Sequence, residues 1–417
     1  MVTPTVSRAA VVLSGNELLD GRTRDTNGAF LSADLSDRGV KVGSVLTVAD
    51  DERRLTEALR FSLAAEPDLL VIGGGLGTTH DDLTAVCLAE ALEVGLEEHP
   101  LALAMLEERV RVVAARRDLD FDQVLALARR QALLPAGSTP VSPAGVAPGI
   151  AARRGNTRVY AFPGVPFEFE AMWREVAQEL EAGGLFPDVA VRIVRIFGVG
   201  ELQVAPILET VPRDRLETGI NVGSGEVTVR LRYPRETLAQ EQVAAVVAAL
   251  EDHAPVYSSD GRTVDDLVAD GLRARRVTVA VAESCTGGLL GARLSARPGS
   301  SDYFAGGVIS YANEVKTGFL GVRPGMLAQY GAVSEEVAGA MADGVRVATG
   351  ADYSLAVTGV AGPGGGTSEK PVGLVYTACA GPGGTAVARG HFPGDRAAVR
   401  DYSVTRALHL LLRHLGA

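Results

Sequence analysis

The sequence predicts an α/β fold divided into more than one domain, and three observations carry that prediction. Residues 1–170 alternate short apolar runs with longer amphipathic stretches, as strands and helices do in parallel sheets. Further along, the β-branched run at 277–281 ends in AESCTGG, and LLGARL then begins a helical pattern. A chain of 417 residues is also too long for a single hydrophobic core. We therefore expect two or three domains.

The first domain is expected over residues 1–170 as a doubly wound sheet of largely parallel strands. Its alternating pattern predicts strands at Ala9–Ser14, Val40–Val48, Leu69–Gly73 and Arg158–Phe162, and helices over 27–38, 51–65, 82–94 and 99–115.

Two further domains are expected after it. Residues 171–257 predict a small α+β module with strands at Val189–Phe197 and Glu226–Tyr233 and a helix near 236–251. A linker containing SSDG at 258–261 leads into an α/β domain over 260–417. The first helix of that domain, at 263–275, has an apolar stripe typical of a helix with one buried face.

The turn at 282–288 is the strongest candidate for chemistry. A strand–turn–helix there would place the Ser284 hydroxyl at a helix N-terminus, among N–H groups that can hold a phosphate or an oxyanion. Tyr311 and Lys316 follow about one helical turn apart, and a serine with a lysine and a tyrosine can hydrolyse an amide without histidine. Lysine acts as a base only where its pKa is lowered. The alternative is an N-capping Ser284, a solvated Lys316 and a strand residue at 311.

Neighbouring residues extend this candidate site. We expect Cys285 to be a packed small residue whose N–H, with those of Thr286 and Gly287, contributes to an oxyanion hole. The glycine-rich loop at 359–366 follows a strand-like run and suits phosphate or ribose contacts, or is a plain flexible loop. Arg396 and Arg400 lie one turn apart and can share a phosphate, although a solvated face is an alternative for Arg400.

The first domain carries a second candidate site. In VIGGGLGTTHDDLT at 71–84, an apolar strand leads into glycines that let a loop approach phosphates, followed by Asp81 and Asp82. Carboxylates beside such a loop can hold a divalent metal, while helix N-capping is the alternative for Asp81. SGNELLDG at 14–21, Thr26-Asn27 and FPGVPFE at 162–168 should converge on the same cleft.

From about Thr263 onward the chain resembles the nicotinamide mononucleotide amidohydrolase domain of the CinA (competence/damage-inducible) family. The resemblance rests on AESCTGG at 282–288, PGSSDYFAGGVISYANEVK at 298–316, TGVAGPGGG at 358–366, KPVGLV at 370–375 and FPGDRAAVR at 392–400. It implies hydrolysis of the carboxamide to acid and ammonia without a cofactor, with Ser284 as nucleophile, Lys316 as base and Tyr311 as proton relay or orienting group. The substrate-binding residues it implies are Glu283, Cys285, Thr286, Gly287, Asn313, Thr358, Gly359, Gly362 and Arg396.

Residues 1–170 resemble the molybdopterin-binding-like domain at the N-terminus of the same family, which is linked to metal-dependent ADP-ribose pyrophosphatase activity. The resemblance implies a divalent metal of the Mg²⁺ or Co²⁺ type at Asp81 and Asp82. This chain departs from the family pattern at Gly73, Thr78, Ser142 and Val146, which puts that activity in question. The implied substrate-binding residues are Gly15, Glu17, Asn27, Gly74, Gly75, Gly77, Thr79, Pro163 and Gly164.

Composition limits the partners. A net charge of −11, with Arg-Arg pairs dispersed along the chain, argues against a nucleic-acid-binding surface. The three cysteines show no metal or disulfide spacing, and the chain has neither a signal-peptide pattern nor a run of membrane-spanning length, so we expect a cytoplasmic protein. A homodimer is expected from the family resemblance.

Other functions fit the same sequence. The N-terminal domain can instead be a pterin- or nucleotide-binding module without activity, with a competence-related protein partner, or an assembly scaffold for an active amidohydrolase. Binding of ADP-ribose or pterin without turnover would favour the binding module.

Overall fold

The computed structural model describes residues 5–416, which divide into two compact units at Ala190/Val191. The fold is mixed α/β, as the sequence predicts. No helix in the described part of the chain is long and apolar enough to span a membrane.

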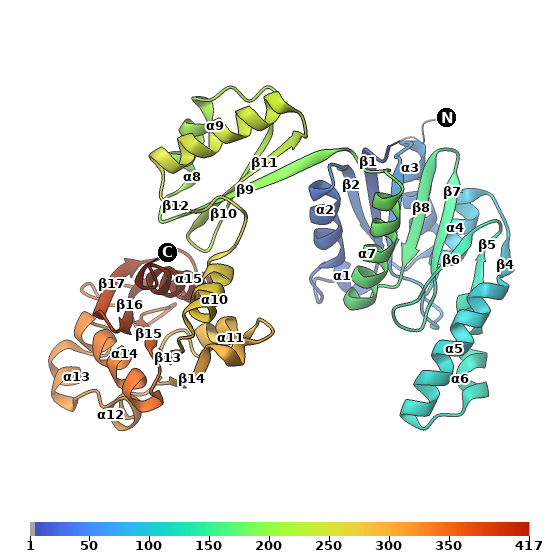
Figure 1. Ribbon diagram of the computed structural model, residues 1–417. Helices are drawn as coiled ribbons and strands as arrows, with labels where there is room; N and C mark the ends of the chain where they lie inside the picture. The colour runs from blue at the N-terminus through green and yellow to red at the C-terminus, as the bar shows by residue number, and fades with distance from the viewer. Residues whose placement is uncertain (1–4, 417) are drawn as a thin grey trace. The chain divides into compact units, whose positions relative to one another are not determined.

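The first unit is built on a six-stranded sheet in the order β2-β1-β3-β8-β7-β6, with helices on both faces (Figure 1). β2, β1, β3 and β8 are mutually parallel, whereas β7 and β6 are antiparallel additions at one edge. Its main elements are β1 (Arg8–Ser14), α1 (Asn16–Leu19), α2 (Asn27–Asp37), β2 (Lys41–Val48), α3 (Glu52–Ala64), β3 (Leu69–Gly73), α4 (Thr84–Leu92), α5 (Pro100–Arg117), α6 (Phe121–Ala128), β6 (Thr139–Val141), β7 (Gly149–Arg154), β8 (Thr157–Phe162) and α7 (Pro166–Ala182).

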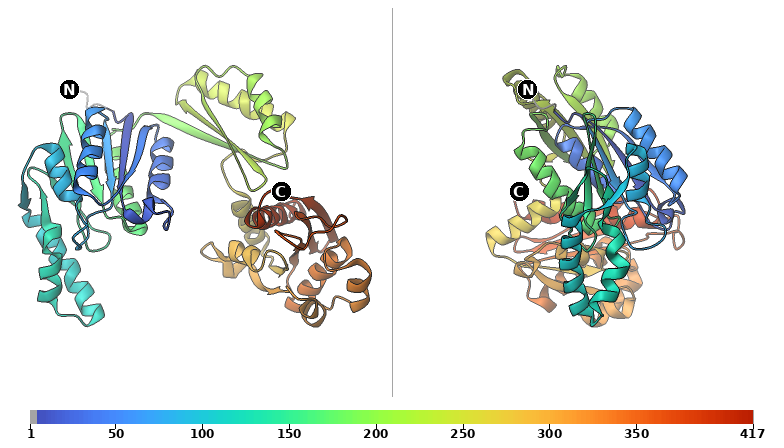
Figure 2. Two further views of the ribbon diagram at one scale, coloured as in Figure 1. Left: turned by 180° about the vertical axis from the view of Figure 1, so that it is seen from behind. Right: turned by 90° about the vertical axis from the view of Figure 1, so that its right-hand side faces the viewer.

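The sheet of this unit is buried on both faces, which explains its continuous apolar strands. Val12 faces a core formed with α3, α4 and α5, while Val11 faces a second core formed with α2 and α7. The doubly wound arrangement predicted from the sequence is therefore present. A short ladder, β4 (Leu96–Glu98) with β5 (Leu133–Pro135), flanks the hairpin of α5 and α6, which projects from the sheet (Figure 2).

One predicted boundary differs from the structure. The sequence places residues 171–182 in the middle module, but α7 packs Phe169, Trp173 and Val176 against the first sheet. The buried face of this helix begins before residue 170 and runs on through Leu180, so the helix belongs to the first unit as one piece.

The second unit contains two sheets. The first has the order β10-β11-β9-β12 with two helices, where the sequence predicts only two strands and one helix. Its elements are β9 (Val189–Phe197), α8 (Glu201–Glu209), β10 (Glu217–Gly223), β11 (Glu226–Pro234), α9 (Thr237–His253) and β12 (Val256–Ser258).

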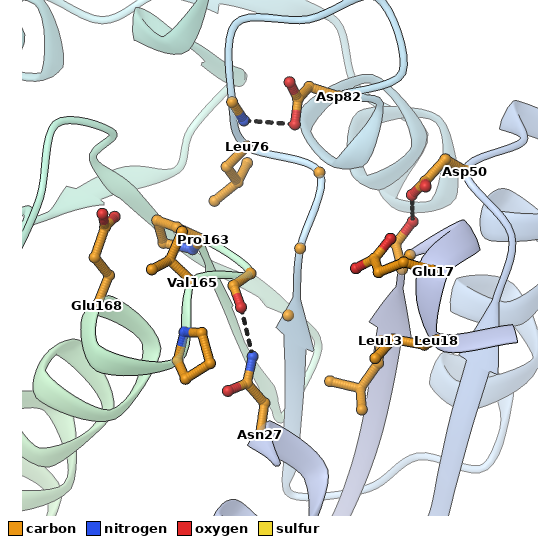
Figure 3. A pocket seen from close by; sticks show the side chains of 18 of the residues that line it. Leu13, Glu17, Leu18, Asn27, Asp50, Leu76, Asp82, Pro163, Val165 and Glu168 are labelled. Carbon is orange, nitrogen blue, oxygen red and sulfur yellow. Dashed lines mark hydrogen bonds between the residues drawn. The ribbon is translucent and has the colours of Figure 1, made fainter. Parts of the chain in front are cut away.

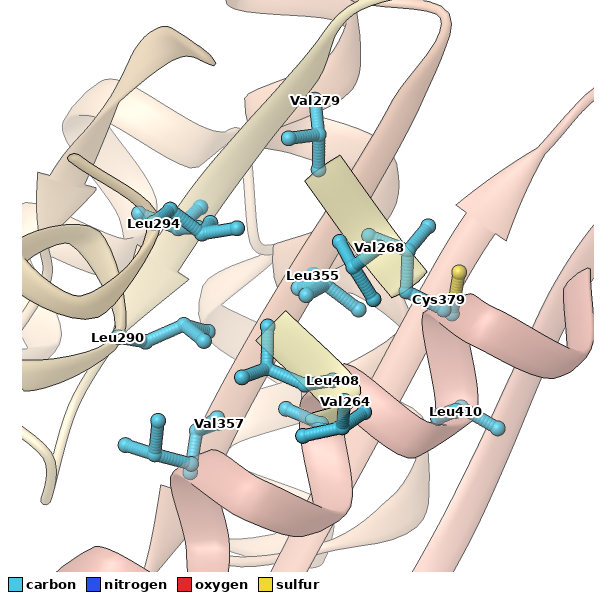
Figure 4. Packing of buried hydrophobic residues seen from close by; sticks show 14 of the residues in the cluster. Val264, Val268, Val279, Leu290, Leu294, Leu355, Val357, Cys379, Leu408 and Leu410 are labelled. Atoms are coloured by element: carbon cyan, nitrogen blue, oxygen red, sulfur yellow. The ribbon is translucent and has the colours of Figure 1, made fainter. Parts of the chain in front are cut away.

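The second sheet of this unit has the order β14-β13-β15-β16-β17, with β13 parallel to both of its neighbours and the last two strands antiparallel. One face packs on α10, α11 and α15 and the other on α14; Figure 4 shows the first of these cores. The elements are α10 (Val264–Arg275), β13 (Val279–Glu283), α11 (Leu289–Ser295), β14 (Phe304–Ile309), α12 (Asn313–Leu320), α13 (Pro324–Tyr330), α14 (Glu335–Thr349), β15 (Tyr353–Gly359), β16 (Leu374–Gly381), β17 (Gly384–His391) and α15 (Arg396–His414).

The parallel strands of this sheet end at one level. Glu283, the last residue of β13, pairs with Ile309 of β14 and Val357 of β15. The loops that follow these three strands therefore start side by side, which is where open α/β sheets bind ligands.

Candidate active sites

The turn after β13 places Ser284 at the carboxyl edge of the sheet, but not at a helix N-terminus. The Ser284 N–H donates to the carbonyl of Val357 (2.9 Å), and α11 begins only at Leu289. Gly287 and Gly288 separate the two with φ values of +57° and +96°, a conformation that favours glycine. The predicted strand and helix are present, with a turn between them longer than the sequence pattern suggests.

Lys316 is brought to this serine from α12. Its side chain is 1% exposed, and its Nζ lies 3.2 Å from Ser284 Oγ. The same nitrogen donates to the carbonyls of Ser310 (2.5 Å) and Tyr311 (3.2 Å). Burial lowers the pKa of Lys316 below its usual 10.5.

These three neighbours accept from the three N–H groups of a protonated Lys316, and they also suit a neutral amine once the Ser284 hydroxyl turns to donate. Two carbonyl oxygens can only accept, so they take the two N–H bonds of a neutral Lys316. The remaining lone pair is then available to the Ser284 hydroxyl. This arrangement can remove a proton from the serine, which is what a nucleophile without histidine requires.

The Tyr311 side chain lies apart from the serine–lysine pair. It is 60% exposed, and its hydroxyl accepts from Arg396 Nη2 at 3.0 Å. Its contact with Lys316 is through the main-chain carbonyl. The structure therefore pairs Tyr311 with Arg396 and shows no hydrogen bond from its hydroxyl to Ser284 or Lys316 among residues 5–416.

Arg396 and Arg400, one turn apart on α15, both line a cavity of about 470 Å³. Arg396 Nη1 donates to the carbonyl of Gly362 (2.8 Å), and Arg400 Nη2 donates to the carbonyl of Thr286 (2.6 Å). The buried Arg400 Nε and Thr286 Oγ1 have no hydrogen-bond partner within residues 5–416. Of these two residues only Arg400 lines the cavity, and its unsatisfied guanidinium nitrogen fits a polar ligand there.

Two other predicted residues, Cys285 and Thr358, are buried. Cys285 is 5% exposed and burial raises its thiol pKa to about 11, so it is packed as the sequence predicts and is a poor nucleophile. Thr358 is buried and its hydroxyl donates to the carbonyl of Ala332 (2.8 Å).

The remaining predicted residues differ in their surroundings. Asn313 is the exposed first residue of α12. A Cβ at Gly359 would meet Val375 at 2.6 Å, so this glycine permits close packing of the strands. The Glu283 carboxylate is buried and bonded to main-chain N–H groups.

The candidate site of the first unit is a cavity of about 580 Å³ at the carboxyl edge of its sheet. Figure 3 shows it between the loops after β1, β3 and β8. A Cβ at Gly74 (φ +102°) would lie 2.3 Å from the Ser14 carbonyl, so the loop needs glycine there. All the residues predicted for this site line the cavity, namely Gly15, Glu17, Asn27, Gly74, Gly75, Gly77, Thr79, Asp81, Asp82, Pro163 and Gly164.

The two carboxylates predicted as metal ligands are bound to their own loop. Asp82 accepts from the N–H groups of Gly77 and Thr79, both at 2.7 Å, and from the Thr79 hydroxyl. The single proton of this hydroxyl is shared with Asp81, whose carboxyl oxygen is the alternative acceptor and whose pKa is lowered by this contact. Neither aspartate caps α4, which begins at Thr84 with Leu83 at its N-cap. No cluster of three or more His, Cys, Asp or Glu suited to a metal ion occurs between residues 5 and 416.

Sequence reasoning singled out none of three further acidic residues that line this cavity, Asp25, Asp50 and Glu168, although Glu168 lies in the 162–168 stretch expected at the cleft. Asp50, just after β2, accepts from the Ser14 hydroxyl (2.5 Å) and the Asn16 N–H (2.9 Å). Glu168 lies on the opposite side (Figure 3), and burial raises its pKa above the usual 4.5. Asp50 and Glu168 both follow a strand end, and that position is the signal that could have identified them.

Two of the four residues that depart from the family pattern lie at the cavity of the first unit, and two lie away from it. Gly73 and Val146 line the cavity, whereas Thr78 and Ser142 do not. A Cβ at Gly73 would lie 2.9 Å from both Leu13 and Phe169, so the packing here is built around a glycine.

Known proteins are similar to this chain over nearly its full length. Residues 262–415 match the family model "CinA C-terminal domain", and residues 10–182 match "Probable molybdopterin binding domain". A "CinA-like protein" of Mycolicibacterium vanbaalenii is 40% identical over 424 residues, covering 98% of this chain and 99% of that protein. The "CinA-like protein" of Mycobacterium tuberculosis is 38% identical, covering 98% of each.

Solved structures similar to part of the chain include a CinA superfamily protein of Klebsiella pneumoniae. It is 36% identical, with a TM-score of 0.36 over 37% of this chain and 99% of that one. The CinA protein of Thermoplasma acidophilum is 32% identical, with a TM-score of 0.37 over 42% of this chain and 99% of that one.

Proposed function

This chain belongs to the CinA family, and on that premise we propose that its C-terminal domain hydrolyses nicotinamide mononucleotide to nicotinate mononucleotide and ammonia. The observation that carries the proposal is the 3.2 Å separation between Ser284 Oγ and the buried Nζ of Lys316. A desolvated lysine beside a serine hydroxyl is an arrangement for acyl transfer.

In the first half-reaction, Ser284 Oγ attacks the carboxamide carbon while its proton passes to Lys316 Nζ. The resulting oxyanion binds main-chain N–H groups of the turn. Lys316 then returns the proton to the amide nitrogen, the C–N bond breaks, and ammonia leaves an acyl-serine. In the second half-reaction a water molecule gives a proton to Lys316 and attacks the ester carbon. The bond between this carbon and Ser284 Oγ then breaks, Lys316 returns the proton to Ser284 Oγ, and nicotinate mononucleotide leaves.

The arginine-lined cavity supports a phosphorylated substrate. Arg396 and Arg400 present guanidinium groups to it, and the buried Nε of Arg400 has no partner among residues 5–416. A phosphate is an acceptor that guanidinium groups bind well. We propose that the nucleotide phosphate binds here and that Tyr311, through its hydrogen bond to Arg396, orients this arginine.

For the N-terminal domain we propose nucleotide binding, with cleavage of ADP-ribose to AMP and ribose 5-phosphate as its candidate reaction. The glycine loop at Gly74 and Gly75, which lines the cavity, supports a pyrophosphate ligand. The donor set does not fit the expected divalent metal, because Asp81 and Asp82 are bonded within their loop and no third ligand accompanies them in residues 5–416.

That disagreement favours the alternative of a pterin- or nucleotide-binding module, or an assembly scaffold, without catalysis. Isothermal titration with ADP-ribose and with a pterin, alongside an assay for AMP with and without Mg²⁺ or Co²⁺, separates the candidates. Release of AMP supports the pyrophosphatase; binding without AMP supports the module. A cytoplasmic homodimer is also proposed, and light scattering of the purified chain tests the dimer.

The amidohydrolase is tested by ammonia release from nicotinamide mononucleotide, with the unaltered chain, Ser284→Ala and Lys316→Ala in parallel. Turnover that falls by at least about 10³-fold in both variants is expected for a nucleophile and its base. No turnover by the unaltered chain would contradict the proposed activity, and retained turnover in Ser284→Ala would contradict the nucleophile. The circular dichroism spectrum and the Tm of each variant serve as the folding control.

A further inference from the structure

Glu283 is a buried carboxylate directly before the serine. Its side chain is 1% exposed, yet no cation pairs with it among residues 5–416. Its oxygens accept instead from three main-chain N–H groups at the start of α11: Gly288 (3.0 Å), Leu290 (3.0 Å) and Gly291 (2.8 Å). The carboxylate oxygens are thus held by main-chain N–H groups at the start of α11.

With Glu283 in place, most N–H groups of the turn have acceptors. Ser284 N–H donates to Val357, and Gly287 N–H donates to the carbonyl of Ser284 (3.1 Å). The N–H groups of Cys285 and Thr286, adjoining the serine, have no main-chain acceptor within residues 5–416, and the Cys285 N–H contacts only its own thiol. Two adjacent free donors beside a nucleophile are what an oxyanion requires.

The same turn is held from its other side and connected to the lysine. Arg400 Nη2 binds the Thr286 carbonyl (2.6 Å), which fixes the peptide that follows the two free donors. The main-chain carbonyl of Glu283 accepts from the Ser310 N–H (2.7 Å), and the Ser310 carbonyl accepts from Lys316 Nζ. Glu283 therefore lies where the turn and the lysine loop meet.

From these contacts we infer that Glu283 is a positioning residue for amide hydrolysis and does not contact the substrate. Its carboxylate fixes the turn so that the N–H groups of Cys285 and Thr286 stay free for the oxyanion formed when Ser284 attacks. This inference rests on the proposed amidohydrolase function. It replaces the substrate-binding role that the sequence predicts for Glu283.

Glu283→Gln tests the inference with almost no change in shape. An amide can keep the bonds to Gly288 and Leu290 through its oxygen, but its NH₂ group then opposes the Gly291 N–H. We expect kcat for ammonia release to fall on the order of 10- to 100-fold, because small displacements of catalytic groups cost this much. The KM should stay within about two-fold, as for an interaction made only in the transition state.

Two further measurements separate positioning from other roles. In the Ser284→Ala background, calorimetry of nicotinamide mononucleotide should give the same Kd with Glu283 or Gln. Hydrogen exchange of the amides at 288–291 should become faster in Glu283→Gln, which is independent of turnover. Glu314→Gln is the matched control: it removes the exposed carboxylate whose charge acts on Lys316, and no side-chain hydrogen bond joins Glu314 to the turn among residues 5–416.

The outcomes differ clearly. The positioning role would be overturned if Glu283→Gln kept the wild-type kcat. It would also be overturned if Glu283→Gln weakened nicotinamide mononucleotide binding in the Ser284→Ala background. A shift of the acid limb of the pH profile matching that of Glu314→Gln would instead assign Glu283 an effect on Lys316 through charge. If Glu283→Gln does not fold, Glu283→Asp keeps the charge but shortens the side chain, and it should lose kcat in the same way. Absence of ammonia release by the unaltered chain would refute the proposed function itself.

Discussion

The Nζ atom of Lys316 lies 3.2 Å from the Oγ atom of Ser284, although 32 residues separate them along the chain. The serine follows β13 and the lysine lies in the first turns of α12, after β14. Because β13 and β14 are parallel neighbours, their carboxyl ends deliver both residues to the same edge. The lysine is also buried, and this burial lowers its pKa, as a base that activates the serine requires.

Lys316→Arg should abolish amide hydrolysis while keeping the positive charge. An arginine does not lose its proton at any working pH, so it cannot act as the base. We expect ammonia release to fall at least about 10³-fold. In the unaltered chain, kcat/KM should rise with pH along an acid limb that lies below 10.5, because burial lowers the lysine pKa and only the neutral amine is active. A profile that is flat or falls with pH over that range would contradict this.

The same lysine should make stability depend on pH. Its pKa is lower in the native chain than the usual 10.5, so between the two values the unfolded chain binds more protons and the free energy of unfolding rises with pH. In Lys316→Met this dependence disappears. The Tm difference, variant minus wild type, should therefore fall from pH 7 to pH 10. Lys41→Met, which replaces an exposed lysine in the same way, serves as the control.

Tyr311→Phe separates an orienting role from a proton relay. The hydroxyl is bonded to Arg396 and the carbonyl to Lys316, so the variant should keep the serine–lysine pair intact. We expect kcat within about three-fold of wild type and a KM raised several-fold, since only the anchoring of Arg396 is lost. A relay would instead cost roughly 10²- to 10⁴-fold in kcat. Steady-state kinetics with nicotinamide mononucleotide decide between them.

Asp82 should matter more than its neighbour for nucleotide binding. Asp82 holds the N–H groups of Gly77 and Thr79, whereas Asp81 bonds only the Thr79 hydroxyl and its own main chain. Removing the two main-chain hydrogen bonds to the Asp82 carboxylate should release the loop. We expect Asp82→Ala to weaken ADP-ribose binding at least about ten-fold and Asp81→Ala less than about three-fold, by calorimetry. Equal losses would point to a shared metal ion.

Gly74→Ala should disable the first unit alone. The added Cβ would lie 2.3 Å from the Ser14 carbonyl in a backbone conformation with φ of +102°. The two strand ends would have to separate, so nucleotide binding should be lost while ammonia release is unchanged. Gly95→Ala is the control, because its Cβ meets nothing within 4 Å. Loss of ammonia release in Gly74→Ala would show that the two sites are coupled.

Much of the architecture could be predicted because local patterns specify it. The strand over Leu69–Gly73 is observed with the predicted bounds, since a short apolar run that ends in glycines permits little else. Long-range packing was harder to predict. The helix α7 has an amphipathic pattern, but the pattern does not say which sheet will cover its apolar face.

For the candidate sites, the sequence by itself determined which residue types stand at the strand ends: Ser284 in a glycine turn, Gly74 in a phosphate-type loop, and a lysine after β14. The tertiary structure alone decided their chemical state. Burial of Lys316 depends on packing between elements distant in sequence, and this packing lowers its pKa. The bonds of Glu283 and Asp82 to nearby main-chain N–H groups depend on the path of each turn, because a carboxylate can bind a ligand, a metal or its own loop with the same oxygens.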